Sequence, residues 1–189
     1  MLSRWLVAAG GLAGGAVVLA GSAEEGRSAQ SQEQDERIFN FALGLEYLQA
    51  AFYAHALERG QLRGELREFA RVVGGQERAH VRFIRDQLGN AAREEPEFDF
   101  GDLAADEERF SQAALALEES GVGGYIGQGA NLTVEGVAAA APIVSVEARH
   151  AAWIRDLVGE NPAPAAADPA KTAAQVRSEL ERAGFQLPA

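Results

Sequence analysis

The chain has 189 residues, a formal net charge of −11 and no cysteine. This length suits one domain with a full hydrophobic core. The lack of thiols excludes disulfides, thiolate metal sites and iron–sulfur clusters, and the acidic balance argues against nucleic-acid binding because no basic stripe is available to neutralise phosphates. Abundant alanine and few clusters of β-branched residues favour an all-α fold.

The first 23 residues have the order of a secretory signal peptide. One positive charge, at Arg4, precedes an apolar, glycine-rich run over residues 5–20, and small residues then lead to Ala23, where we expect cleavage. Retention of the segment as a membrane anchor is the alternative, although the run is slightly short for a full span. The sequence therefore predicts an exported protein, periplasmic or extracellular, with a flexible linker over residues 24–34.

Apolar residues recur at helical spacing in four segments between residues 35 and 160. These segments predict the helices of one bundle, over residues 35–59, 65–88, 105–126 and 134–158. The aperiodic stretch 90–104 is long enough, when extended, to cross the length of a helix. We therefore expect a four-helix bundle with a long crossover between its second and third helices.

Two further features concern the fourth predicted helix and the residues that follow it. Pro142 lies inside the fourth segment, which predicts a kink or a later helix start there. Residues 161–189 are predicted to be a C-terminal extension beyond the bundle. Within it, a short amphipathic helix over 171–182 is expected to pack on the outside of the four helices.

The most informative motif is a glutamate followed three positions later by a histidine, and it occurs twice. Glu77 precedes His80, and Glu147 precedes His150. Residues three apart on a helix lie about 60° apart round its axis, so both side chains reach one point. Each pair takes core-facing positions that a bundle normally gives to apolar residues.

A lone glutamate precedes each pair by about the same distance. Glu46 lies 31 residues before Glu77, and Glu118 lies 29 residues before Glu147. In each predicted hairpin the midpoint between the lone glutamate and its pair falls in the connecting turn, so antiparallel helices bring them to one level. A buried lone carboxylate is costly unless it is paired or bound to metal. We therefore predict a site for two metal ions made by Glu46, Glu77, His80, Glu118, Glu147 and His150; the alternative is a pair of core histidines with salt-bridged glutamates.

Helical phase also separates the weaker candidates. Glu119 is rotated by about 100° from Glu118, which makes Glu118 the better choice. His55 lies on the face of its helix opposite the lone glutamate and is predicted to be a surface residue. Tyr53 and Tyr125 each follow a lone glutamate by seven residues and share its face. They are either hydrogen-bond partners that orient the metal ligands or packed core tyrosines.

Three stretches around these motifs resemble a known family. They are Asn-Phe-Ala-Leu-x-Leu-Glu-Tyr-Leu-x-Ala-Ala-Phe-Tyr over 40–53, Leu-Glu-Glu-x-Gly-Val-Gly-x-Tyr over 117–125 and Glu-Ala-Arg-His-Ala-Ala over 147–152. They are similar to the exported bacterial ferritin-like domain family, which is related to plant desiccation-related proteins and lies within the ferritin-like di-iron superfamily. In that superfamily, two helices each supply one glutamate and two supply Glu-x-x-His. The resemblance covers about residues 36–160.

The resemblance implies the same six ligands, two iron ions or alternatively manganese as cofactors, and a ferritin-like form of the four-helix bundle. Members often carry a twin-arginine signal, which this chain lacks. The resemblance does not select one reaction, since sites of this type support several oxygen chemistries.

Function is therefore predicted only as a class. We expect iron oxidation, or the handling of oxygen or peroxide, under oxidative or desiccation stress. A non-enzymatic protein that binds metal or protects against stress is the alternative, and a metal-free structural bundle is a third reading. The expected partners are metal ions and oxygen or peroxide, without nucleic acid; a homo-oligomer is left open, and a membrane is a partner only if the N-terminal segment stays uncleaved.

Overall fold

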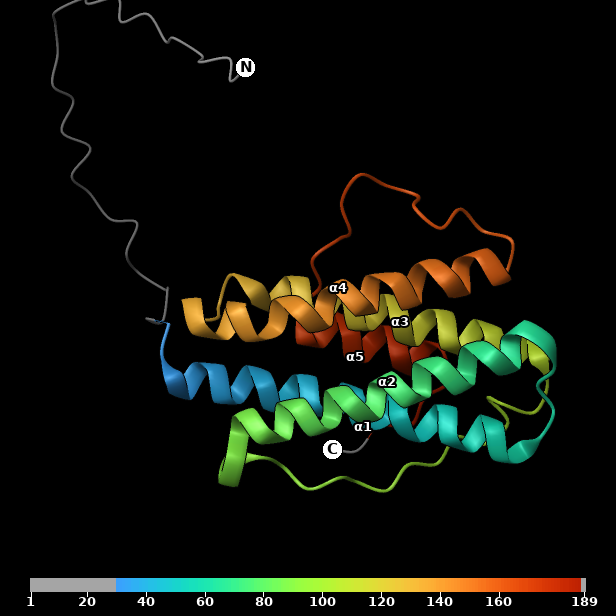
Figure 1. Cartoon of the computed structure of the whole chain (residues 1–189), viewed down its shortest axis with the longest axis horizontal. Helices are drawn as coiled ribbons and strands as arrows, with labels where there is room; N and C mark the ends of the chain where they lie inside the picture. Colours follow the sequence, from blue (N-terminus) through green and yellow to red (C-terminus); the bar gives the residue numbers. More distant parts are fainter. Residues whose placement is uncertain (1–29, 188–189) are drawn as a thin grey trace, which may run out of the picture.

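The computed structural model of the chain describes residues 30–187, and over this range the protein is all-α (Figure 1). The predicted signal peptide and the first part of the predicted linker lie outside the described residues. The helices are α1 (Gln32–Arg59), α2 (Gly64–Leu88), α3 (Glu107–Gly129), α4 (Val134–Leu157) and α5 (Ala173–Arg182), with one 3-10 turn, η1 (Gly89–Ala91), after α2.

The four long helices form two antiparallel hairpins, α1 with α2 and α3 with α4 (Figure 1). From the end of η1 the chain returns along the side of the bundle, and α3 begins at the opposite end (Figure 1). This is the long crossover that the aperiodic stretch predicted. The helical bundle with a short C-terminal helix is therefore confirmed.

Helix α1 begins three residues earlier than its apolar period predicts. Its first residue is Gln32 because Ser31 takes the N-cap position and accepts a hydrogen bond from the backbone N–H of Gln34. Glu33 and Asp35 in the first turn suit the positive end of the helix dipole. The last residues of the predicted flexible linker are thus helical.

Helix α4 contains Pro142 and still begins at Val134, so the later start that this proline predicted is wrong. The cap explains the early start, since Oγ1 of Thr133 accepts a hydrogen bond from the backbone N–H of Gly136. Pro142 removes one amide donor from the helix interior. Because Pro142 and Ala138, four residues earlier, are both exposed, water can reach the carbonyl that this amide would have bound.

The hydrophobic core is divided into two clusters along the bundle. On α1, the buried apolar residues between positions 38 and 47 belong to one cluster, and those between positions 48 and 56 belong to the other. The second cluster is rich in aromatic rings, and Phe52 stacks on Phe110 with ring centroids 5.7 Å apart. The glutamates and histidines of the predicted site lie at the level where the two clusters meet. The polar layer is therefore enclosed by apolar packing along the bundle axis.

Helix α5 packs against α3, and its apolar face is part of the core. Val176 and Leu180 have no exposed surface and belong to the larger cluster. The chain approaches α3 closely before α5 begins, and the backbone N–H of Lys171 donates to the carbonyl of Gly123 at 2.9 Å. The C-terminal extension is thus tied to the same helix that carries Glu118.

Close approach at α3 requires a residue without a side chain. A Cβ on Gly127 would lie 1.9 Å from the carbonyl oxygen of Lys171. We expect Gly127→Ala to lower the free energy of unfolding by about 1–3 kcal/mol, because the C-terminal segment must shift to admit the methyl group. Urea unfolding followed by circular dichroism measures this. The control is Gly129→Ala on the same helix, where a Cβ meets nothing within 4 Å; equal stability of the two variants would contradict the prediction.

Candidate metal centre

The six side chains singled out by their spacing meet in the middle of the bundle. α1 supplies Glu46, α2 supplies Glu77 and His80, α3 supplies Glu118, and α4 supplies Glu147 and His150. None of the four glutamates has exposed surface, and both histidines are buried. Each helix therefore buries its charged residues at one level, as helical phase predicted.

Nδ1 of His80 faces three of the carboxylates. It lies 3.2 Å from Oε2 of Glu46, 3.1 Å from Oε2 of Glu77 and 3.1 Å from Oε1 of Glu147. Donor atoms of these four residues all lie within 4.8 Å of one another. They form the first group that could hold a metal ion.

Nδ1 of His150 occupies the matching position in the second group. It lies 2.9 Å from Oε1 of Glu77, 3.3 Å from Oε2 of Glu118 and 3.8 Å from Oε1 of Glu147. These four residues also bring their donor atoms within 4.8 Å of one another. The lone glutamate of each hairpin thus belongs with the histidine of the same hairpin.

Glu77 and Glu147 are shared between the two groups. Glu77 presents one oxygen to each side, since Oε2 faces His80 and Oε1 faces His150. The two imidazole rings have their centroids 6.1 Å apart. This is the arrangement that two neighbouring metal ions need, with two shared carboxylates between them and one carboxylate and one imidazole at each end.

The site carries buried polar atoms that the protein does not satisfy. Oxygens of Glu77, Glu118 and Glu147 and Nδ1 of His150 are buried without a hydrogen-bond partner of acceptable geometry. Each such atom costs about 1–3 kcal/mol. With neutral imidazoles, the four carboxylates carry the charge that two divalent cations would balance. The residues present therefore fit a pair of divalent metal ions.

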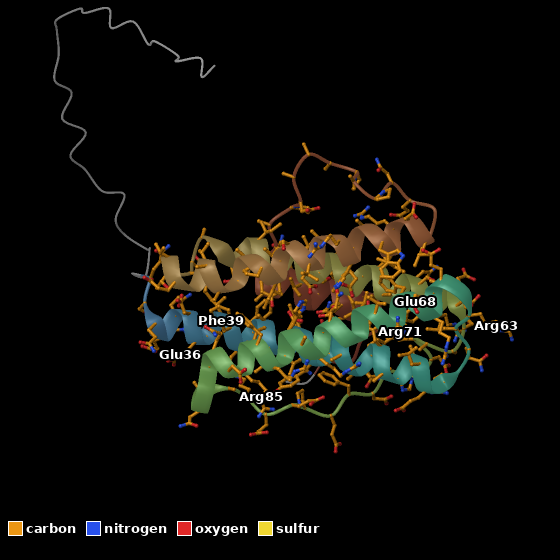
Figure 2. The ribbon with its side chains drawn as sticks, in the orientation of Figure 1. Glu36, Phe39, Arg63, Glu68, Arg71 and Arg85 are labelled. Atoms are coloured by element: carbon orange, nitrogen blue, oxygen red, sulfur yellow. The ribbon has the colours of Figure 1, made fainter. Side chains whose placement is uncertain are left out.

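Some other glutamates of the bundle have arginine partners, and those of the site have none among the described residues. Glu68 pairs with Arg71 on the exposed face of α2, where Figure 2 labels both residues. Glu119 pairs with Arg155 on α4. Within residues 30–187, the ion pairs recorded for the four buried carboxylates all go to His80 or His150 and none to lysine or arginine. In this part of the chain, no lysine or arginine side chain therefore balances these carboxylates.

Without metal, the site retains protons. Burial raises the pKa of Glu46 to about 8 and that of Glu147 to about 7. Burial lowers the pKa of both imidazoles, but the close contacts with the surrounding carboxylates outweigh it and raise the pKa of His80 to about 12 and that of His150 to about 10. The metal-free protein at neutral pH thus holds both histidines as imidazolium ions, with Nδ1 of each facing the carboxylates.

Tyr53 and Tyr125 are hydrogen-bond partners of the site, and each crosses to the other hairpin. The hydroxyl of Tyr53 on α1 donates to Oε1 of Glu118 on α3, and that of Tyr125 on α3 donates to Oε1 of Glu46 on α1, the latter at 2.5 Å. Seven residues span about 10 Å along a helix, too far for a tyrosine to reach the glutamate on its own helix. The neighbouring antiparallel helix brings the other glutamate level with it.

Two glutamines also reach the site, and sequence reasoning did not identify them. Nε2 of Gln49 lies 3.4 Å from Oε1 of Glu118 and 3.4 Å from Oε2 of Glu147. Oε1 of Gln76 lies 2.5 Å from Nε2 of His150. Gln49 follows Glu46 by three residues and shares its face, which is the one signal that could have found it. No such signal exists for Gln76, because it is exposed and lies off the core-facing positions of α2.

His55 lies away from the site and at the surface, as predicted, although it is partly covered. The side chain is half-buried because the crossover covers it, and its ring centroid lies 5.3 Å from that of Phe100. Arg59 donates to Nε2 of His55 at 3.3 Å. The crossover was expected as an extended connection, and its contact with α1 could not be predicted from helical phase.

A groove of about 430 Å³ between α2 and α4 reaches the site. Its lining includes His80 and His150 together with Val72, Ala79, Val146 and Arg149. The glutamates do not line it. Solvent therefore meets the histidine side of the site and not the carboxylates.

The ferritin-like domain model matches residues 34–160 of this chain. The chain belongs to the ferritin-like domain family. This membership agrees with the resemblance and with the four-helix architecture of this ferritin-like protein, and the match spans all six site residues. No curated protein matches the chain. Within residues 30–187, no helix has both the length and the apolar character required to cross a membrane.

Proposed function

We propose that this ferritin-like protein holds a dinuclear centre of iron, or alternatively of manganese, and handles oxygen chemistry with it. One observation carries the proposal: six buried side chains from four helices converge with unsatisfied donor atoms and without a lysine or arginine. Oxygen-rich ligand sets with few imidazoles suit iron and manganese, whereas thiolates, which this chain lacks, would favour softer ions.

Each residue has a defined role in this proposal. Glu46 and His80 would hold one ion, and Glu118 and His150 would hold the other. Glu77 and Glu147 would contribute to both positions. When bound, the two ions supply two adjacent one-electron redox centres. The tyrosines hold one oxygen of each lone glutamate by a hydrogen bond, which fixes the orientation of the other oxygen.

The reaction we propose is the oxidation of ferrous iron by oxygen. As substrates, two ferrous ions give up one electron each. One O₂ molecule takes both electrons and two protons and leaves as hydrogen peroxide. Consumption of peroxide is the related activity, in which two further ferrous ions give up one electron each and, with two protons, the peroxide is converted to two water molecules.

We further propose that the protein acts outside the cytoplasm, in the periplasm or beyond the cell, under oxidative or desiccation stress. The order of charge, apolar run and small residues over the first 23 positions supports export. The similarity of residues 40–53, 117–125 and 147–152 to exported relatives of desiccation-related proteins supports the link to stress.

The test adds ferrous iron to the purified metal-free protein and follows oxygen uptake and ferric absorbance. We expect both to be faster than in buffer alone, and the acceleration to disappear in Glu77→Gln. Glu119→Gln, whose glutamate pairs with Arg155, serves as the control and should keep the full rate. Two bound metals with no acceleration would instead favour the non-enzymatic metal-binding protein. A protein that binds no metal would refute the dinuclear centre itself.

A further inference from the structure

The two halves of the site repeat each other in sequence. A shift of 72 residues relates α1 to α3, and a shift of 70 relates α2 to α4. The four glutamates, two histidines and two tyrosines match under these shifts. Among the described residues that contact the site, only the two glutamines have no counterpart of the same type. Gln49 corresponds to Gly121, and Gln76 corresponds to Val146.

Gln76 supports only one of the two histidines. Its Oε1 lies 2.5 Å from Nε2 of His150, so Nε2 keeps its proton and Nδ1, which faces the centre of the site, is the nitrogen left to bind an ion once its own proton is displaced. On the other side, the equivalent residue Val146 is apolar. In the described part of the chain, no hydrogen bond to Nε2 of His80 is recorded. The His80 ring therefore lacks the outer support that His150 has.

Gln49 also supports the side of the site that contains Glu118 and His150 more than the side that contains Glu46 and His80. Its Nε2 donates to Glu118 and Glu147 from the space beside Gly121, where a Cβ would lie 2.8 Å from Oε2 of Glu147. Glu118 thus has two hydrogen-bond donors outside the metal positions, Tyr53 and Gln49. The corresponding donor to Glu46 is Tyr125.

Solvent access follows the same division. The side chain of His80 is 11% exposed and that of His150 is 4% exposed, although both line the groove between α2 and α4. Gln76 lines this groove too and lies over the outer edge of His150. The His80 side is therefore both less supported and more open.

We propose that the two metal positions are unequal. The position of Glu118 and His150 binds its ion first and more tightly, and the position of Glu46 and His80 exchanges its ion through the groove. Gln76 is the positioning residue that sets the difference. This inference rests on the dinuclear centre proposed above and assigns an order to it.

Isothermal titration of the full metal-free chain with Mn²⁺ under anaerobic conditions tests the order. We expect two steps in the parent protein, of which Glu118→Gln removes the tighter and Glu46→Gln the weaker. Gln76→Val should weaken the tighter step by about 10- to 100-fold, the usual effect of losing a hydrogen-bond partner of a metal ligand. Gln76→Glu keeps an oxygen acceptor and should keep the tighter step. The matched control is Gln87→Val, an exposed glutamine of the same helix.

The reciprocal change tests the other position. Val146→Gln should place an amide opposite His80 and strengthen the weaker step, so that the two affinities approach each other. Two equal steps in the parent protein, or equal weakening of both steps by Gln76→Val, would overturn the inference while leaving the dinuclear centre intact. No uptake of Mn²⁺ by the parent protein would refute the dinuclear centre instead. Urea unfolding of each metal-free variant distinguishes a loss of binding from a loss of folding.

Discussion

Replacing either shared glutamate by glutamine is expected to abolish the paired site. Glu77 presents one oxygen to each histidine, and Glu147 presents Oε1 to both. Glutamine keeps the shape of the side chain but removes its charge and turns one acceptor into a donor. We expect Glu77→Gln and Glu147→Gln each to bind at most one Mn²⁺ per chain. The affinity of that ion should fall by at least about 100-fold, since even hydrogen-bond partners of ligands contribute 10- to 100-fold.

Metal analysis after equilibrium dialysis, together with calorimetric titration, measures both quantities. The control is Glu119→Gln, which removes a carboxylate next to Glu118 in sequence but paired with Arg155 in the structure. Urea unfolding of the metal-free glutamine variants checks that they fold, because removing one partner of a buried charge pair lowers stability. Two tightly bound ions in both variants would show that the assigned residues do not form the site.

The second large effect is stabilisation by metal, and we expect it to grow with pH. Ions at 100 times their dissociation constant add about 2.7 kcal/mol each, or about 5–10 °C in Tm for a domain of this size. The ions displace protons, because carboxylates and imidazoles must be deprotonated to bind them. The difference in Tm between the Mn²⁺-loaded and metal-free protein should therefore increase from pH 5.5 to pH 8.5. Scanning calorimetry of both forms in the same buffers measures it.

The direction of this pH dependence follows from the pKa values of the site residues. The folded metal-free protein binds protons more tightly than the unfolded chain, since the pKa of Glu46 rises from 4.5 to about 8 and that of His80 from 6.5 to about 12. Protonation therefore contributes stability at low pH, and this contribution is lost as pH rises through these ranges. Surface groups affect both forms equally and cancel in the difference. A difference that is flat or falls with pH would contradict the proton–metal exchange.

Helical phase was sufficient to place the residues that each helix turns toward the core. A glutamate and a histidine three apart, both in apolar positions, identify one face of α2 and one face of α4 without any tertiary information. The same periodicity separated Glu118 from Glu119, and the structure buries the first and pairs the second with Arg155. These predictions depend on local geometry, which the order of residues along one helix determines.

Contacts between hairpins could not be read in this way. Tyr53 shares a face with Glu46 but donates to Glu118, and Gln76 lies next to Glu77 but contacts His150. Each of these pairs joins residues more than 60 positions apart, as the separations of 65 and 74 show. Periodicity reports which side of a helix is buried, and it carries no information on the neighbour that covers this side.

The spacing of the paired motifs thus established the helices, the depth of the site and the identity of its six candidate ligands, because these follow from the 3.6-residue period and the length of two hairpins. Only the packing of α1 against α3 and of α2 against α4 decided which carboxylates are shared, which tyrosine holds which glutamate, and which histidine is supported. The physical reason is that these features depend on the distance between side chains of different helices, and this distance is set by how the two hairpins pack against each other.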